Sequence, residues 1–343
     1  MSAGGAERVM SVLVNEIASS TDHTIEMICF ARNYYSNRFY LLHEKVRLHL
    51  VERNNVFEMQ SLLCDIRPDL VVSFLNPMNY VVSVAARNLH IPHIACERND
   101  PYLSPFGEED RKCRDEAFNN AEGCVFQTEN AAQYFHGKTS GLTKVIINPV
   151  VLDVEEVPDS RENKVVAVGR YAPQKNYFTM LDSFGLFKQL HPDYKLECYG
   201  KDAGLLDELL AYATSMKLED NVAFFTETKD LHQRISTAKL FLMTSSFEGQ
   251  SNALAEAAAL GIPCVASRIP GIQDIVEQYQ FGLLCPSNRT DEIANAMHKI
   301  VNNSTLWNQM SQNGKRIYEE RRVDHIAKQW LDFVYLVINN TKE

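Results

Sequence analysis

Short runs of β-branched and other apolar residues alternate along the chain with longer segments in which apolar residues recur at helical spacing. This alternation is typical of α/β proteins with parallel sheets and helices on both faces. In the first half it predicts strands at residues 24–30, 69–75, 92–96, 123–127 and 144–148, and helices at residues 6–18, 78–89 and 110–120. In the second half it predicts strands at residues 164–169, 194–200, 221–225, 239–245 and 263–267, with a helix after each, the first at residues 177–190.

A turn-rich, acidic stretch at residues 149–163 interrupts this alternation. The length of 343 residues also favours two domains, at about 150 residues per domain. We predict an N-terminal domain over residues 1–150, a C-terminal domain over residues 151–320, and a helix within residues 321–343 that packs back towards the N-terminal domain. The expected architecture is two Rossmann-like doubly wound domains that face each other across a cleft, because such sheets bind ligands at the carboxyl ends of their strands.

The start of the chain departs from this pattern. A doubly wound domain begins with a strand that leads into its first ligand-facing loop, whereas here the loop-like residues 2–8 stand directly before a helix. The first central strand of the N-terminal domain is therefore expected to be missing. We predict that the natural reading frame begins about ten residues upstream, the length of a strand and its approach.

Charge and composition exclude several classes of protein. The net charge is −10 and neither half is basic, which argues against a nucleic-acid partner. The eight cysteines form no Cys-x-x-Cys pair, so reduced thiols are expected rather than a zinc site or disulfides. The apolar runs are too short to span a bilayer, and the N-terminus lacks the features of a signal peptide. We therefore expect a cytoplasmic protein.

Two cations stand between a predicted strand and a predicted helix. Arg170 and Lys175 follow the strand at residues 164–169 and precede the helix at residues 177–190. Their charges would add to the positive end of the helix macrodipole and to its unpaired N–H groups, which together favour an anion such as a diphosphate. By position alone, a solvated basic turn explains these residues equally well.

Two glutamates with seven residues between them mark a second loop-to-helix junction. Glu248 lies in the loop, and Glu256 lies about one turn into the helix, with Ser251 or Asn252 as the predicted N-cap. Gly249 lets a ligand approach the backbone closely. The spacing is too long for two carboxylates that share a proton, but it suits a nucleotide-sugar, with hydroxyls on two rings and phosphates between them. For Glu256 the alternative is a solvated helix residue, although its neighbours are small and apolar.

The set formed by GGAER near the start, Gly-Arg-x4-Lys-Asn in mid-chain and Glu-x7-Glu resembles glycosyltransferase family 4, the retaining nucleotide-sugar transferases of the GT-B fold. The resemblance covers nearly the whole chain, including the stretches GIQDIVE and FGLLCP. It points to enzymes of bacterial capsule, lipopolysaccharide or glycoprotein glycan assembly. The resemblance also implies a UDP-sugar as the donor, because this nucleotide is common in the family.

The resemblance implies a role for each matching residue. Arg170 and Lys175 match the pair that neutralises the donor diphosphate, and Glu248 matches the glutamate beside the transferred sugar. Glu256 matches the glutamate that holds the nucleotide ribose. The remaining donor-binding positions would be Gly4, Gly5, Gly169, Gly249, Gln250, Ser251 and Asn252.

The match is weaker in the stretch CERNDPY. Many family members have a histidine near Arg98 that touches the sugar, and this chain has none there. A proline common near position 251 is also missing. The segment is therefore expected only to line the cleft, with candidate acceptor contacts at Glu97, Arg98, Asn99 and Asp100.

The resemblance also implies a mechanism without a metal or a cofactor. The chain contains no Asp-x-Asp motif, so the two cations and the helix termini would stabilise the leaving diphosphate. The acceptor would be a saccharide or a lipid-linked saccharide. Aromatic and basic tracts at residues 33–42 and 101–114 suit such an acceptor at the inner face of a membrane, with peripheral association, but ordinary loops explain them as well.

Other functions fit parts of the pattern. A nucleotide-sugar 2-epimerase shares the architecture, and a non-catalytic partner subunit would explain the short N-terminus and the missing histidine. A dinucleotide oxidoreductase is disfavoured, because neither half has Gly-x-Gly-x-x-Gly after a strand. We expect a hexosyltransferase or N-acetylhexosaminyltransferase.

Overall fold

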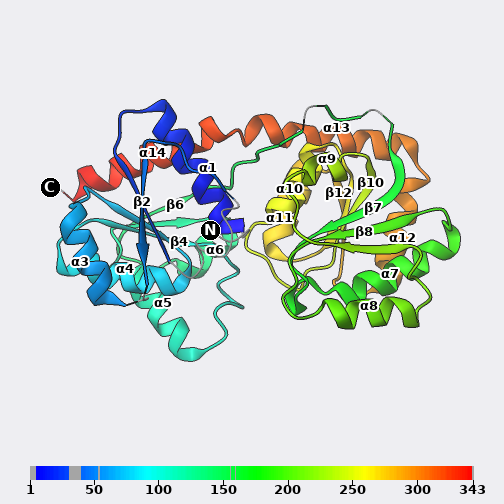
Figure 1. Cartoon of the computed structure of the whole chain (residues 1–343), viewed down its shortest axis with the longest axis horizontal. Helices are drawn as coiled ribbons and strands as arrows, with labels where there is room; N and C mark the ends of the chain where they lie inside the picture. Colours follow the sequence, from blue (N-terminus) through cyan, green and yellow to red (C-terminus); the bar gives the residue numbers. More distant parts are fainter. Residues whose placement is uncertain (1–4, 31–39, 53–54, 155, 159, 342–343) are drawn as a thin grey trace. The chain divides into compact units, whose positions relative to one another are not determined.

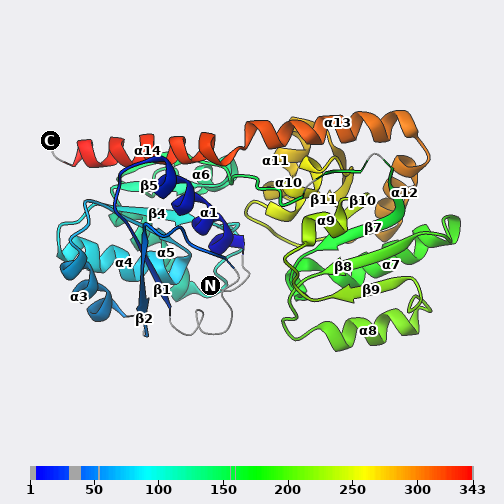
Figure 2. The same cartoon turned by 45° about the horizontal axis from the view of Figure 1, so that its top comes forward.

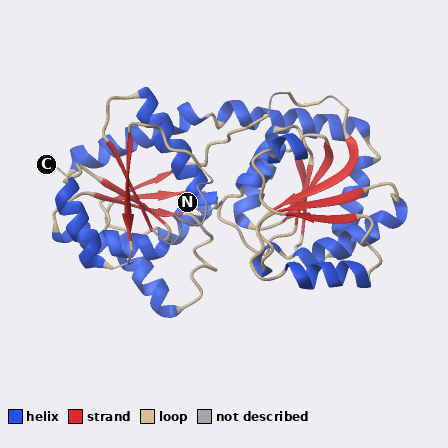
Figure 3. Cartoon of the chain, in the orientation of Figure 1, coloured by secondary structure: helices blue, strands red, loops and turns tan. Residues whose placement is uncertain are grey.

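The computed structural model describes residues 5–30, 40–52, 55–154, 156–158 and 160–341. The chain divides into two compact units, of which unit 1 takes Met1–Pro149 and Arg321–Glu343 and unit 2 takes Val150–Glu320. In each unit, helices lie on both sides of the strands (Figure 1, Figure 3). Each unit therefore has its own layered α/β core.

Unit 2 is built on one six-stranded parallel sheet with the order β12-β11-β10-β7-β8-β9. Its first strand, β7, lies in the middle, and the chain winds outwards from it in both directions. The strands are β7 (Glu162–Val168), β8 (Lys195–Tyr199), β9 (Val222–Phe225), β10 (Ala238–Met243), β11 (Cys264–Ser267) and β12 (Gly282–Cys285). The helices are α7 (Tyr177–Leu190), α8 (Leu206–Ser215), α9 (Leu231–Ile235), α10 (Asn252–Ala259), α11 (Pro270–Tyr279), α12 (Thr290–Val301) and α13 (Ser304–Glu320), with a short 3-10 turn η1 (Pro173–Lys175) before α7.

The two faces of this sheet pack against different helices. Because side chains alternate along a strand, Val165 faces one core with α7, α8 and α12, while Val166 faces another with α10 and α11. In Figure 2, α8 and α10 lie on opposite sides of the sheet. This double burial explains why the central strands read as continuous apolar runs.

Unit 1 contains two parallel sheets, β1-β2 and β3-β4-β5-β6. Within the described residues, no strand precedes α1. The strands are β1 (Ile25–Phe30), β2 (Val46–Val51), β3 (Val71–Phe74), β4 (His93–Glu97), β5 (Gly123–Phe126) and β6 (Leu142–Val145). The helices are α1 (Gly5–Ser20), α3 (Val56–Ile66), α4 (Asn76–Asn88), α5 (Glu108–Asn120), α6 (Glu129–Phe135) and, from the end of the chain, α14 (Val323–Asn340).

Helix α14 belongs to the core of unit 1. Its residues at helical spacing, Ile326, Trp330, Phe333 and Val337, are buried with α1 and with the inner face of the four-stranded sheet. The Trp330 and Phe74 rings lie 5.7 Å apart between their centroids. The apolar stripe of this helix therefore serves packing.

The strand predictions fail mainly at sheet edges. Strands β2 and β12 were not predicted, and β6 lies two residues earlier than the expected strand at residues 144–148. In β2, Arg47 and His49 alternate with apolar residues, so the segment lacks the apolar run of a central strand. An edge strand has one neighbour and less to bury, which weakens its signal in the sequence.

None of the described helices is both long and apolar enough to cross a membrane. All eight cysteines are unpaired, and five of them are buried. No disulfide therefore constrains either unit.

Candidate functional site

The candidate site of unit 2 lies at the carboxyl ends of β7 and β10. These strands are parallel neighbours in the sheet, so the loops that follow them lie side by side. The first loop carries Arg170 and Lys175, and the second carries Glu248. The sheet order thus brings together residues that are more than 70 positions apart in the sequence.

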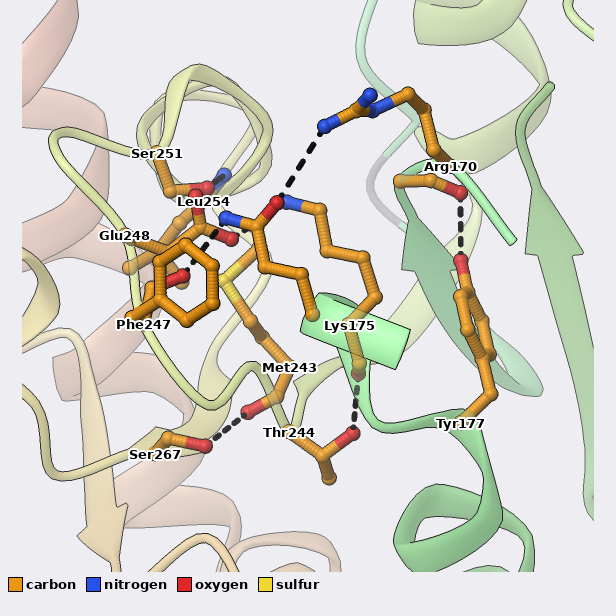
Figure 4. Close-up of polar contacts among 12 residues, drawn as sticks. Arg170, Lys175, Tyr177, Met243, Thr244, Phe247, Glu248, Ser251, Leu254 and Ser267 are labelled. Atoms are coloured by element: carbon orange, nitrogen blue, oxygen red, sulfur yellow. Dashed lines mark hydrogen bonds and ion pairs between the residues drawn. The ribbon is translucent and has the colours of Figure 1, made fainter. Parts of the chain in front are cut away.

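Lys175 and Glu248 form an ion pair. The Lys175 Nζ lies 2.5 Å from the Glu248 Oε1, and their side chains are 16% and 10% exposed (Figure 4). Partial burial shields the pair from water, so its electrostatic interaction is stronger than that of an exposed pair. The Lys175 ammonium group has three N–H donors, and the bond to Glu248 uses one of them.

Backbone and side-chain bonds lock the two loops together. The carbonyl oxygen of Gln174 accepts the N–H of Ser246 (2.8 Å), and its side-chain Nε2 donates to the carbonyl oxygen of Phe247 (2.9 Å). The Thr244 hydroxyl donates to the carbonyl oxygens of Lys175 (3.1 Å) and Asn176 (3.0 Å) in a shared bond. The cation and the carboxylate are therefore held from their backbones as well as by their mutual attraction.

Two glycines allow close approaches that this arrangement needs. A Cβ on Gly169 would lie 2.9 Å from the Lys175 Cε, so the missing side chain leaves room for the lysine. A Cβ on Gly271, at the start of α11, would lie 1.7 Å from the carbonyl oxygen of Gly249. Only glycine fits at position 271 without a shift of the backbone beside Glu248.

Arg170 is placed beside this pair but is exposed. Its Nη2 donates to the Gln174 Oε1 at 3.4 Å, which directs the guanidinium towards the second loop. Helix α7 begins directly after the loop, and its N-cap, Asn176, makes no side-chain capping bond within the helix. The Asn176 side chain donates instead to the carbonyl oxygen of Ser287 at 3.0 Å.

The second glutamate of the motif lies in α10. Ser251 is the N-cap of this helix, and its hydroxyl accepts the N–H of Leu254 at 3.4 Å. Glu256 is 5% exposed, so it is not a solvated helix residue. Its Oε2 lies 3.0 Å from the Nε2 of His232, a buried residue of α9.

The other predicted donor-binding residues line the same loop and helix start. Gly249 is buried, whereas Gln250 and Asn252 are partly exposed. The structure thus gathers nearly all predicted residues of the C-terminal half at one edge of the sheet. Among the N-terminal positions, Gly5 is the exposed first residue of α1, and Gly4 lies outside the described residues.

Sequence reasoning missed several residues of this region. Gln174 joins the loops, Gly271 admits the Gly249 carbonyl, and His232 contacts Glu256. Gln174 stands between the two cations in the sequence, so its position was a usable signal. His232 is 24 residues from its partner and has no local signature.

The stretch CERNDPY forms a tightly bonded loop at the carboxyl end of β4 in unit 1. The Glu97 Oε1 accepts the N–H groups of Arg98 (2.9 Å) and Asn99 (3.0 Å), and Asp100 caps the N–H of Tyr102 (2.9 Å). The guanidinium of Arg98 lies 4.4 Å from the ring centroid of Phe74. Glu97, Arg98 and Asp100 are buried and Asn99 is partly exposed, so these contacts give most of the segment a local structural role.

Burial changes the protonation of this loop. The Glu97 side chain is buried and its Oε2 has no hydrogen-bond partner within the described residues. Burial raises the pKa of Glu97 to about 7, against the opposing effect of the backbone N–H groups of Asn99 and Arg98. Burial also lowers the pKa of Arg98 to about 10, which still leaves it charged at neutral pH.

The tract at residues 33–42 lies largely outside the described residues.

Comparison with known proteins identifies the chemistry of unit 2. Residues 152–317, almost the whole unit, match the family model described as glycosyl transferases group 1. Residues 152–317 therefore form a domain of the group 1 glycosyltransferase type. This conclusion confirms the predicted class of enzyme.

Curated relatives carry names from the same class. An uncharacterized glycosyltransferase of Haemophilus influenzae is 24% identical over 344 residues, which cover 96% of each chain. The UDP-Gal:alpha-D-GlcNAc-diphosphoundecaprenol alpha-1,3-galactosyltransferase of Escherichia coli is 30% identical over 175 residues, 49% of this chain and 45% of the relative.

Solved structures establish the fold of the transferase. HepE of Anabaena, solved in complex with UDP and glucose, matches with a TM-score of 0.83 at 18% identity over 97% of this chain and 96% of that chain. The sucrose-phosphate synthase of Thermosynechococcus elongatus also gives a TM-score of 0.83, at 17% identity over 98% and 94% of the two chains. The predicted GT-B class is confirmed, whereas membership of family 4 and a retaining mechanism remain predictions.

Proposed function

We propose that this transferase moves a sugar from a nucleotide-sugar, with UDP as the nucleotide, to a saccharide or a lipid-linked saccharide. The proposal includes retention of configuration at the anomeric carbon and no requirement for a metal. The observation that carries it is the partly buried Lys175–Glu248 pair beside Arg170, at the ligand-binding edge of a group 1 glycosyltransferase domain.

Each residue of this edge has a role in the proposed transfer. Arg170 and Lys175 bind the donor diphosphate, and Glu248 accepts hydrogen bonds from the hydroxyls of the transferred sugar. Glu256 binds the nucleotide ribose. The buried Gly249 and the loop that leads to α10 present backbone groups to the donor sugar and phosphates. Gly169 makes room for the lysine, because a Cβ at this position would lie 2.9 Å from the Lys175 Cε.

The proposed chemistry is a same-face displacement. The bond from the anomeric carbon to the phosphate oxygen breaks, and the acceptor oxygen bonds to the same face of that carbon. The acceptor proton passes to the departing phosphate oxygen, so the products are the glycosylated acceptor and UDP. Arg170 and Lys175 stabilise the charge that develops on the diphosphate, and fixed cations of this kind need little reorganisation during the reaction.

The acceptor half of the proposal involves unit 1. Gly4 and Gly5 belong to this unit, and we retain them as donor-binding residues. Glu97, Arg98, Asn99 and Asp100 belong to the same unit, and we retain them as acceptor residues. Burial of most of the latter segment favours Asn99 as the side chain that meets a ligand directly. A lipid-linked acceptor and peripheral attachment to the inner face of a membrane are supported by the diphosphoundecaprenol substrate in the name of the E. coli relative.

The test is release of UDP from a panel of UDP-sugars, with and without an extract of lipid-linked glycans. Acceptor-dependent UDP release, retained in EDTA, with an added sugar detected by mass spectrometry, is the expected result. Conversion of the donor to an isomeric UDP-sugar without any acceptor would indicate a 2-epimerase, and UDP release without any acceptor would indicate a hydrolase. Absence of turnover with intact UDP binding would indicate a non-catalytic subunit.

A further inference from the structure

We infer that His232 is a positioning residue that orients Glu256 for the ribose of the donor. This inference rests on the proposed role of Glu256 and extends it to a residue outside the recognised motif. The two side chains are 5% and 6% exposed, and the His232 Nε2 lies 3.0 Å from the Glu256 Oε2. The contact joins α9 to α10, two helices on the same side of the sheet.

A second hydrogen bond assigns the proton of the imidazole. The backbone N–H of Asp153 donates to the Nδ1 of His232 at 2.8 Å. A backbone N–H is always a donor, so Nδ1 has to be the unprotonated nitrogen. The ring proton is therefore on Nε2, and it is donated to the Glu256 carboxylate.

This tautomer makes His232 a neutral partner. A protonated imidazolium would cancel the charge of the carboxylate, whereas the neutral ring orients one oxygen and leaves the negative charge in place. A carboxylate accepts about four hydrogen bonds. A bond from one neutral N–H donor therefore leaves acceptor capacity that suits a ribose diol, which offers two O–H donors.

The contact with His232 restricts the conformation of the Glu256 side chain. A long side chain in a helix has several rotamers, and a hydrogen bond from another element selects one of them. The backbone N–H of Asp153 in turn fixes the orientation of the His232 ring. The histidine is therefore a rigid partner for Glu256.

The experiment measures the affinity for UDP and for 2′,3′-dideoxy-UDP by calorimetry. His232→Phe should weaken UDP binding roughly tenfold, the effect of one hydrogen bond to a charged group. It should leave the affinity for dideoxy-UDP within about twofold, because that ligand has no diol for Glu256 to bind. His232→Gln retains an N–H donor and should recover part of the loss.

A double variant tests whether the two residues act through one contact. His232→Phe combined with Glu256→Gln should bind UDP no more weakly than Glu256→Gln alone, since the partner of the histidine is already altered. His191→Phe, which changes a histidine of the same unit that lies against His298, is the matched control and should not alter the preference for UDP over dideoxy-UDP.

The outcomes separate the inference from the proposed function. If His232→Phe and His232→Gln weaken both nucleotides equally, or weaken neither, the positioning role is overturned while the role of Glu256 stands. If Glu256→Gln leaves the preference for UDP over dideoxy-UDP unchanged, the ribose assignment fails, and the inference fails with it.

Discussion

Two buried carboxylates, one in each unit, stand at the carboxyl ends of parallel strands and meet different partners. In unit 2, Glu248 follows β10 and pairs with the ammonium group of Lys175. In unit 1, Glu97 ends β4, and within the described residues it accepts hydrogen bonds from the backbone N–H groups of Arg98 and Asn99. Burial raises its pKa to about 7, although these N–H groups and the charges of Arg114 and Arg98 act in the opposite direction. The same residue type after a parallel strand therefore forms an ion pair in unit 2, whereas in unit 1 burial raises its pKa towards neutrality.

The comparison shows that carboxylates after parallel strands can meet different partners. An ion pair offsets the loss of hydration at Glu248, whereas at Glu97 burial outweighs the backbone N–H groups and the nearby guanidinium charges. Glu256 is a third case, because a neutral imidazole orients it.

Removal of either cation should have the largest effect on turnover. Lys175→Ala and Arg170→Ala should each lower kcat by about 10²–10³, because each removes a charge that stabilises the leaving diphosphate. The measurement is the rate of UDP release at saturating donor and acceptor. The matched control is Lys195→Ala, which should retain full activity. Lys195 is an exposed lysine at the amino end of β8, whereas the candidate site lies at the carboxyl ends of the strands. Unchanged turnover in both cation variants would remove the proposed mechanism.

Replacement of Glu97 should change how stability depends on pH. The ordinary pKa of a glutamate is 4.5 and the folded value is about 7. Between these values the unfolded chain is ionised and the folded one is protonated, so stability falls as pH rises through this window and levels off above it. The loss is about 3 kcal/mol at most, and Glu97→Gln should lack it.

Urea unfolding at pH 5 and pH 8 measures this difference. The chain has two tryptophans, and Trp330 lies in the core of unit 1 whereas Trp307 packs in unit 2. A Trp307→Phe background therefore makes Trp330 fluorescence a reporter for the unit that contains Glu97. If the free energy of unfolding falls by the same amount from pH 5 to pH 8 in the Glu97 protein and in the Glu97→Gln variant, the assigned pKa is contradicted.

A methyl group at position 271 should disturb the loop that carries Glu248. The Cβ of Gly271→Ala would overlap the Gly249 carbonyl, and overpacking of this kind costs about 1–3 kcal/mol. Urea unfolding followed by Trp307 fluorescence reports on unit 2. Gly185→Ala, whose Cβ would meet the flexible end of Met216 at 3.1 Å, is the control and should be tolerated. Equal stability of the two variants would show that the loop relaxes freely.

The same substitution, glutamate to glutamine, should have different effects on turnover and on UDP binding at the two glutamates of the motif. Glu248→Gln removes the charge opposite Lys175, so it should lower turnover while UDP binds as well as before or more tightly. Glu256→Gln should weaken UDP binding about tenfold, the effect of weaker acceptance from the ribose. Calorimetry and UDP release measure the two quantities separately. The same effect on both quantities in both variants would argue against distinct roles.

The sequence alone predicted the elements that depend on local pattern. The central strands of both units were evident because burial on two faces requires continuous apolar runs, and the helix at Tyr177–Leu190 was predicted with its observed bounds. Arg170, Lys175, Glu248 and Glu256 were selected as candidates from their positions at strand ends and helix starts, and their predicted roles came from the family resemblance.

Only the tertiary structure could supply the partners of these residues. The order β10-β7 brings Lys175 to Glu248, and the packing of α9 against α10 brings His232 to Glu256. Such pairs join positions that are 73 and 24 residues apart. Local periodicity contains no information about which strands become neighbours, because strand order is decided by how the helices close over both faces of the sheet. The sequence by itself therefore determined the candidate side chains, and the fold determined which partners they meet.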